Sequence, residues 1–174
     1  MSAFPDWEQY AVPQHRVQTG CIPTGYEMIL RAAGVEAINF ETFQDEFDLD
    51  KDIKPGQQPK NNFTSVADAV RRRYPQANFK CECFPDREGI KKLCLIEERI
   101  KQQQPVLISL ALEPFGKKGW HIMPVVDSTD DELILLKIMS PNGSKEICKL
   151  PKNELIRIHD NYAGGKDVGY LDNK

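Results

Sequence analysis

Apolar residues first take up a regular spacing near residue 22. They recur every three or four positions, at Ile22, Tyr26, Ile29, Leu30 and Ala33. This spacing places them on one face of an α-helix. Pro23 suits a first helical turn, where its missing N–H is not needed, and Gly34 suits the position just after the last turn. The pattern therefore predicts a helix over 22–33.

Helical spacing returns in the rest of the first hundred residues. It predicts a short helix over 41–47, a second that opens near Ser65 and ends before Pro75, and a third over 87–103. The spacing of the third places one set of residues on its buried face: Ile90, Leu93, Cys94, Glu97 and Ile100. Between the first two helices, the polar segment 48–62 contains two prolines and reads as a long surface loop.

Beyond Pro105 the pattern changes to short, dense apolar runs. These runs predict buried strands at 106–112, 121–126, 133–139 and 146–150, after an earlier short strand at 78–84. A helical turn is predicted over 152–158, and the polar, glycine-rich tail 161–174 is expected to be mobile. Helices before strands are typical of an α+β fold, in which an N-terminal helical part packs on a C-terminal antiparallel sheet.

Length and charge narrow the class of protein. The 174 residues fit one domain over 1–174. A net charge of −3 argues against a nucleic-acid partner, since such proteins usually carry a basic surface. No apolar stretch is long enough to cross a membrane, and the first residues lack the pattern of a signal peptide. Together with the cysteines, these features lead us to expect a cytoplasmic protein.

The five cysteines are odd in number and irregular in spacing, which does not indicate a disulfide framework. Cys81 and Cys83 lie two apart in a predicted strand, so they share one face. This pair is too tight for the usual metal-binding knuckle, and no second Cys/His pair is close in sequence. We therefore expect no metal and no cofactor, and keep a redox or metal role for the pair as a minor alternative.

Cys21 stands at the edge of the first predicted helix. Unpaired backbone N–H groups and the helix macrodipole favour a thiolate at that position. A thiolate is the nucleophile that acyl-transfer chemistry requires. Upstream, the side-chain amide of Gln14 or Gln18 could bind an oxyanion. A small buried hydrophobic residue at a helix start is the competing interpretation of Cys21.

His121 begins a predicted strand after the turn Gly119-Trp120, where an imidazole can face a cleft and act as the base for Cys21. His15 and His159 are the rival histidines. His15 lies close to Cys21 in sequence and could instead stabilise an oxyanion, whereas His159 lies near the tail and is expected to be exposed.

Several of these segments, in this order, resemble the peptidase C39-like group of papain-like cysteine peptidases. The matching runs span roughly Val12 to Leu150: Cys21-Ile22-Pro23-Thr24, Pro105-Val106-Leu107-Ile108, Gly119-Trp120-His121 and Ser140-Pro141-Asn142. The resemblance implies a papain-like fold with Cys21 as nucleophile and His121 as base. The group has a glycine where this chain has Ile22, and an aspartate where it has Ser140. Asn142, or more weakly Ser140, would then orient His121.

Three functions follow from these expectations. The leading one is a cysteine-dependent hydrolase, a peptidase or amidase that acts on a peptide or amide substrate through a Cys21 acyl-enzyme. An acyltransferase on the same scaffold would share every step up to that intermediate. The third is a binding or regulatory domain that keeps the papain-like fold without the activity.

Overall fold

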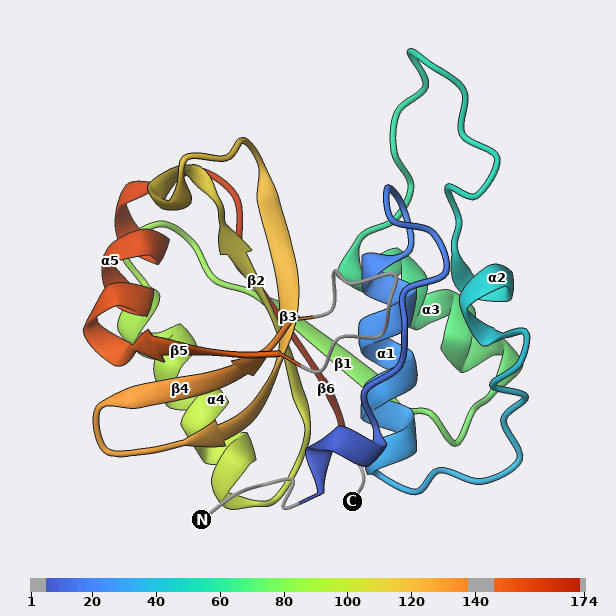
Figure 1. Cartoon of the computed structure of the whole chain (residues 1–174), viewed down its shortest axis with the longest axis horizontal. Coiled ribbons are helices and arrows are strands. Elements are labelled where there is room, and N and C mark those ends of the chain that lie inside the picture. The colour runs from blue at the N-terminus through green and yellow to red at the C-terminus, as the bar shows by residue number, and fades with distance from the viewer. Residues whose placement is uncertain (1–5, 138–145, 173–174) are drawn as a thin grey trace.

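The computed structural model describes residues 6–137 and 146–172 and has helices on both faces of a central sheet (Figure 1). Its longer helices are α1 (Cys21–Ala32), α2 (Phe43–Phe47), α3 (Phe63–Arg73), α4 (Gly89–Lys101) and α5 (Lys152–Asn161). Its strands are β1 (Phe79–Cys83), β2 (Val106–Ala111), β3 (Trp120–Ser128), β4 (Glu132–Leu136), β5 (Ile147–Pro151) and β6 (Asp167–Leu171). The predicted α+β class, with an antiparallel sheet, is confirmed.

The six strands are ordered β1-β6-β2-β3-β4-β5, and every neighbouring pair is antiparallel. Strand β6 therefore lies inside the sheet, hydrogen-bonded to β1 and β2. The expectation of a mobile tail is wrong for this strand. The absence of a side chain at Gly169 allows Tyr26 and Phe63 to pack against this strand, because a Cβ at that position would lie only 3.2 Å from both residues.

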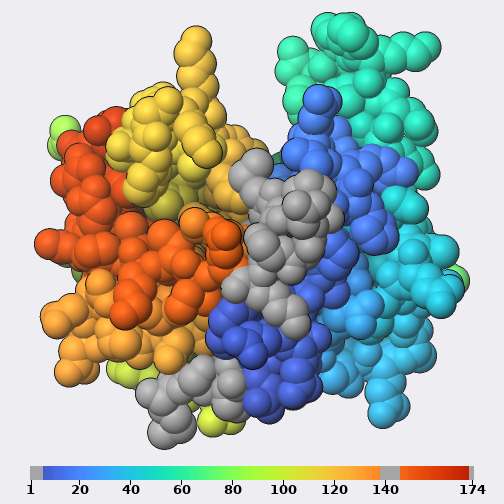
Figure 2. Space-filling model, in the orientation of Figure 1, coloured from blue at the N-terminus to red at the C-terminus, as the bar shows by residue number. Residues whose placement is uncertain are grey.

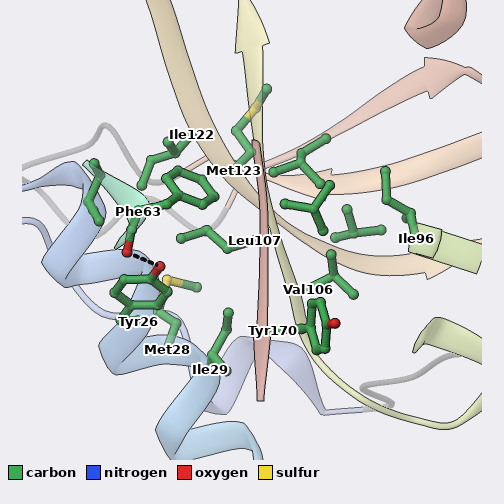
Figure 3. Close-up of a cluster of buried hydrophobic side chains, with 14 of the residues drawn as sticks. Tyr26, Met28, Ile29, Phe63, Ile96, Val106, Leu107, Ile122, Met123 and Tyr170 are labelled. Carbon is green, nitrogen blue, oxygen red and sulfur yellow. Dashed lines mark hydrogen bonds between the residues drawn. The ribbon is translucent and has the colours of Figure 1, made fainter. Parts of the chain in front are cut away.

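The helices divide between the two faces of the sheet. Helix α1 contacts β2 and β3, and α3 contacts β1 and β6, on one face, whereas α4 and α5 cover the other. Figure 3 shows Leu107 and Ile122 directed toward Tyr26 and Phe63, and shows Met123 on the other side of the strand. Helix α2 packs on α1 and α3 rather than on the sheet.

Helix α1 approaches the sheet most closely at Gly25. A Cβ at this position would lie 2.6 Å from Leu107 Cδ1 and 3.3 Å from Ile122 Cδ1. Only a residue without a side chain allows this approach. This contact defines which face of the sheet is covered by α1, here called the α1 face. The Leu107 side chain of β2 and the Ile122 side chain of β3 both point to it.

The buried face of α4 differs from the prediction. Cys94 is exposed and Ile90 is 63% exposed, whereas Lys92 is completely buried. The Lys92 ammonium donates to the carbonyl oxygens of Ser109 and Gly165, both at 2.7 Å. Burial lowers the pKa of Lys92 to about 7, although these two carbonyls favour its charged form. Lys92 was not among the residues that the spacing placed on the buried face, yet its side chain lies in the core.

His159 was expected to be exposed, and this expectation is wrong. Its side chain is 1% exposed on α5, and its Nε2 lies 3.0 Å from the carbonyl oxygen of Pro85. Burial lowers the pKa of the imidazole. His159 therefore joins α5 to the segment before α4, and it is a structural residue rather than a base for Cys21.

The contact of Gly25 with Leu107 predicts a coupled effect of substitutions on stability. Gly25→Ala should destabilise the wild-type protein by roughly 1–3 kcal/mol through overpacking, offset in part by the better helix propensity of alanine. In a Leu107→Val background the same substitution should cost at least about 1 kcal/mol less, because the clashing methyl groups are withdrawn. Urea unfolding of the four proteins measures this coupling, and strictly additive losses would contradict the close approach.

Candidate active site

Cys21 is the first residue of α1, as the sequence predicted within one position, and its side chain is half-buried. Burial raises the pKa of the Cys21 thiol, and the Asp48 carboxylate raises it further. The backbone N–H groups of Ile22 and Cys21 lower the pKa, but they do not outweigh the burial. The helix terminus by itself therefore does not bring the pKa of the Cys21 thiol below its usual value.

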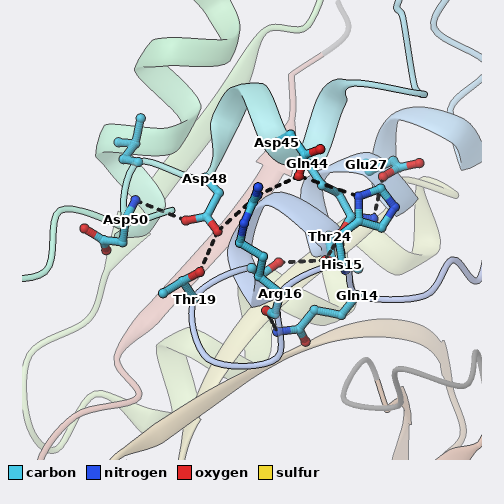
Figure 4. Close-up of polar contacts among 12 residues, drawn as sticks. Gln14, His15, Arg16, Thr19, Thr24, Glu27, Gln44, Asp45, Asp48 and Asp50 are labelled. Carbon is cyan, nitrogen blue, oxygen red and sulfur yellow. Dashed lines mark hydrogen bonds and ion pairs between the residues drawn. The ribbon is translucent and has the colours of Figure 1, made fainter. Parts of the chain in front are cut away.

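The acidic neighbour of Cys21 comes from a segment that the sequence assigned to a surface loop. Asp48 is buried and accepts hydrogen bonds from Thr19 Oγ1 at 2.5 Å and Asn61 Nδ2 at 2.8 Å (Figure 4). Asn61 Nδ2 also donates to the carbonyl oxygen of Thr19. These bonds fix the residues just before Cys21 to the loop that follows α2. No sequence signal marked Asp48, since its partners lie far away along the chain.

Gln44 holds the preceding segment in the same way (Figure 4). Its Oε1 accepts from the backbone N–H of His15 at 2.9 Å and from Thr24 Oγ1 at 2.8 Å, and its Nε2 donates to Glu27 Oε2 at 2.8 Å. The His15 ring is half-exposed, and its Nδ1 lies 3.9 Å from Asp45 Oδ1. His15 is thus positioned through its backbone, with its ring directed to an aspartate.

Neither glutamine is placed as the oxyanion donor that the sequence suggested. The Gln14 side chain is buried, and its Nε2 donates to the carbonyl oxygens of Arg16 at 2.6 Å and Val17 at 3.0 Å. Both donors of that amide are therefore used within its own loop, while its Oε1 is buried without a partner among the described residues. Gln18 is exposed on the same loop.

His121 lies on the face of the sheet opposite to α1. Pro124 and Val126 line a small cavity with Met28 and Ile29 of α1, so the even-numbered residues of β3 face that helix. Side chains alternate along a strand, which places His121 on the other face. Cys21 belongs to α1, so the expected pairing of His121 with Cys21 is not made. By the same alternation, the Trp120 side chain one residue earlier is directed to the α1 face, and it lies beside Gly164.

The environment of His121 also differs from that of a paired base. Burial lowers the pKa of its ring to about 4, and the Lys117 ammonium lowers it further. Its Nε2 is buried without a hydrogen-bond partner among the described residues. A catalytic imidazole needs its reacting nitrogen within hydrogen-bond reach of the thiol, so this ring is not poised to take a proton from Cys21.

Pro124 favours this orientation of β3. It pairs with Leu107 in the ladder between β3 and β2, whereas among the described residues the pairing of β3 with β4 ends at Val125. Proline has no N–H, so its nitrogen must point away from β2 if that ladder is to stay complete. The direction of the backbone N–H and the face of the side chain alternate together along a strand. If the whole of β3 were turned over so that His121 faced α1, the nitrogen of Pro124 would point toward β2. One hydrogen bond of the ladder between β2 and β3 would then be lost.

The third member of the expected triad lies outside the described residues, because both Asn142 and Ser140 fall in 138–145. Cys81 and Cys83 are both in β1, and the Cys81 sulfur lies 3.3 Å from the Tyr26 hydroxyl. Within 6–137 and 146–172, no three His, Cys, Asp or Glu side chains form a set that could hold a metal ion. No described helix has the length and apolar character to cross a membrane.

Comparison with known proteins shows the fold alone. A Bacillus anthracis protein that its crystal structure provisionally describes as a C39-like peptidase superposes with a TM-score of 0.59 at 12% identity, over 94% of each chain. No family model matches the sequence, and no curated protein matches it. The chain therefore has a fold similar to that of a C39-like peptidase, in agreement with the resemblance seen in its sequence.

The site geometry makes a prediction about thiol reactivity. Because the Cys21 pKa is raised from 9.0, its alkylation by iodoacetamide should be slow at pH 7 and should rise with pH beyond 9. His121→Ala should leave this profile unchanged, since the ring faces away from α1. Peptide-resolved mass spectrometry measures the rate at Cys21. A plateau of fast labelling below pH 7 that disappears in His121→Ala would contradict the described arrangement.

Proposed function

We propose that the chain is a ligand-binding domain built on the fold of a cysteine peptidase, without a working cysteine–histidine pair. The observation that carries this proposal is the placement of Cys21 and His121 on opposite faces of the sheet. Folds of this kind host many functions, so the likeness to a peptidase does not by itself assign catalysis. The neutral Cys21 thiol and the occupied amide donors of Gln14 support the same conclusion.

A cysteine-dependent hydrolase is the second candidate, and one observation favours it. The backbone N–H groups of Cys21 and Ile22 lower the pKa of the Cys21 thiol, as a helix N-terminus that stabilises an anion would. In this candidate Cys21 attacks a peptide or amide carbonyl, His121 transfers the proton, and Asn142 or Ser140 orients the ring. Gln14 or Gln18 would supply the second oxyanion donor, and an acyltransferase would use the same residues.

The hydrolase requires a local rearrangement that the chain can accommodate at one place. Trp120 and His121 are the first two residues of β3, and they follow Gly119, which has φ of +84°. Exchange of these two side chains between the faces would leave Pro124 in place. It would break strand pairing only at Ala111 and Leu110. The imidazole would gain a partner for its Nε2, worth on the order of 1 kcal/mol.

We also propose that the protein works in a reducing compartment such as the cytoplasm. All five cysteines are free, at Cys21, Cys81, Cys83, Cys94 and Cys148. Free thiols persist where glutathione and thioredoxin keep them reduced.

Turnover of a panel of fluorogenic peptide, amide and ester substrates distinguishes the two functions. We expect that the wild-type protein shows no turnover that depends on Cys21, so Cys21→Ala should not change the measured rates. Cys94→Ala is the matched control, because Cys94 is an exposed thiol on α4, which packs on the opposite face of the sheet. Activity that survives in Cys94→Ala and disappears in both Cys21→Ala and His121→Ala would reject the binding domain and establish the hydrolase.

A further inference from the structure

A pocket of about 440 Å³ opens on the face of the sheet to which His121 points. This volume falls in the range that small-molecule sites occupy. Its apolar walls come from β2, β3, β4, β5 and the segment after β2: Leu110, Leu112, Phe115, Met123, Leu135, Leu150 and Pro151. In Figure 2 the yellow and red-orange segments that contribute to these walls adjoin on the visible face. The pocket is therefore a concave apolar site that the Cys21 region does not share.

Positively charged side chains outnumber negatively charged ones around this pocket. Lys117, Lys137 and Lys149 line it, together with one acid, Glu154. Glu154 accepts two hydrogen bonds from the Arg157 guanidinium, so its charge is already compensated. Lys137 pairs with Glu146 at 3.3 Å. Neither Lys117 nor Lys149 has an ion-pair partner within 6–137 and 146–172.

The polar groups of the walls point to the same kind of ligand. His121 lines the pocket, and its Nε2 has no hydrogen-bond partner among the described residues. Lys117 lies close enough to disfavour a proton on that ring. A negative charge placed near Lys117 would be attracted to the lysine.

We propose that this pocket binds a small monocarboxylate with an unbranched apolar chain. The chain packs against Leu110, Leu135 and Leu150, and the carboxylate is held at the rim by Lys117. An amphipathic anion satisfies both features of the site, whereas a purely apolar ligand would leave the cation unused and an amine would be repelled by it. The inference rests on the proposed function and names the class of ligand for it.

Cys148 reports directly on the occupancy of the pocket. Its half-buried side chain lies in the wall beside Leu150, so a bound ligand should shield it from alkylation. Cys94 is an exposed thiol outside the walls and serves as the internal control. We expect saturating octanoate to slow iodoacetamide labelling of Cys148 several-fold and to leave Cys94 unchanged. Peptide-resolved mass spectrometry follows both thiols in one sample of the full chain.

Affinity should depend on both ends of the ligand. From hexanoate to octanoate to decanoate, each pair of added methylenes should tighten protection by about tenfold, since each methylene is buried. Lys117→Ala should weaken octanoate by about threefold to fivefold, as expected for a partly exposed ion pair. Lys118→Ala, which removes a neighbouring charge that does not line the pocket, should leave the affinity unchanged.

Two outcomes would overturn the inference. If none of the three carboxylates protects Cys148, the pocket does not bind this class of ligand. If octylamine protects as well as octanoate, the pocket binds apolar chains without regard to charge. Turnover that depends on Cys21 is measured separately, so a hydrolase would refute the proposed function without affecting the protection of Cys148.

Discussion

The packing of α1 on the sheet at Gly25 determines the geometry of the rest of the site. The helix lies so close that a Cβ there would meet Leu107 at 2.6 Å, which fixes one face of β2 and β3 against α1. Side chains alternate along a strand, so this contact also fixes which residues of β3 face away. His121 is one of them. This one helix–sheet contact thus keeps Cys21, at the start of α1, apart from His121. The family resemblance would pair these two residues.

This separation changes what each residue can do. At the N-terminus of α1, Cys21 has the backbone donors that would stabilise a thiolate, but burial and Asp48 keep it protonated in the absence of a cationic partner. His121 is a half-buried imidazole, and burial together with the nearby Lys117 lowers its pKa to about 4. On the opposite face it instead helps to line an apolar pocket with a positive rim. The same sheet therefore presents a thiol on one side and a ligand-sized cavity on the other.

Much of the fold could be predicted from local pattern, and the face of His121 could not. The helix at 22–33 and the strand at 106–112 appear within one residue of their predicted bounds, because their apolar periods match their structures. In contrast, the residues after His121 are Ile-Met-Pro-Val-Val, which are apolar at both odd and even positions. A strand buried on both faces carries no alternation, so its sequence does not say which face the histidine takes.

Other failures have the same origin in contacts that are distant along the chain. Gly169 looked like part of a flexible tail, but it makes room for Tyr26 and Phe63 in an internal strand. Lys92 was not among the residues expected on the buried face of α4, but two carbonyls from other elements accept its hydrogens in the core. Asp48 gave no signal at all, since its role depends on Thr19 and Asn61. Each case needed the tertiary structure, not a better reading of local propensity.

The double variant Trp120→His/His121→Trp tests the central claim most directly, because it exchanges the side chains on the two faces of β3 without changing composition. The measurement is the rate at which iodoacetamide alkylates Cys21 at pH 7 in the variant and in the wild-type protein. If β3 is oriented as described, the variant brings an imidazole to the α1 face, and Cys21 should react about tenfold faster, as for a lowering of its pKa by one unit. Slower alkylation of Cys21 in the variant than in the wild type would show that His121 already pairs with it, and would contradict the account.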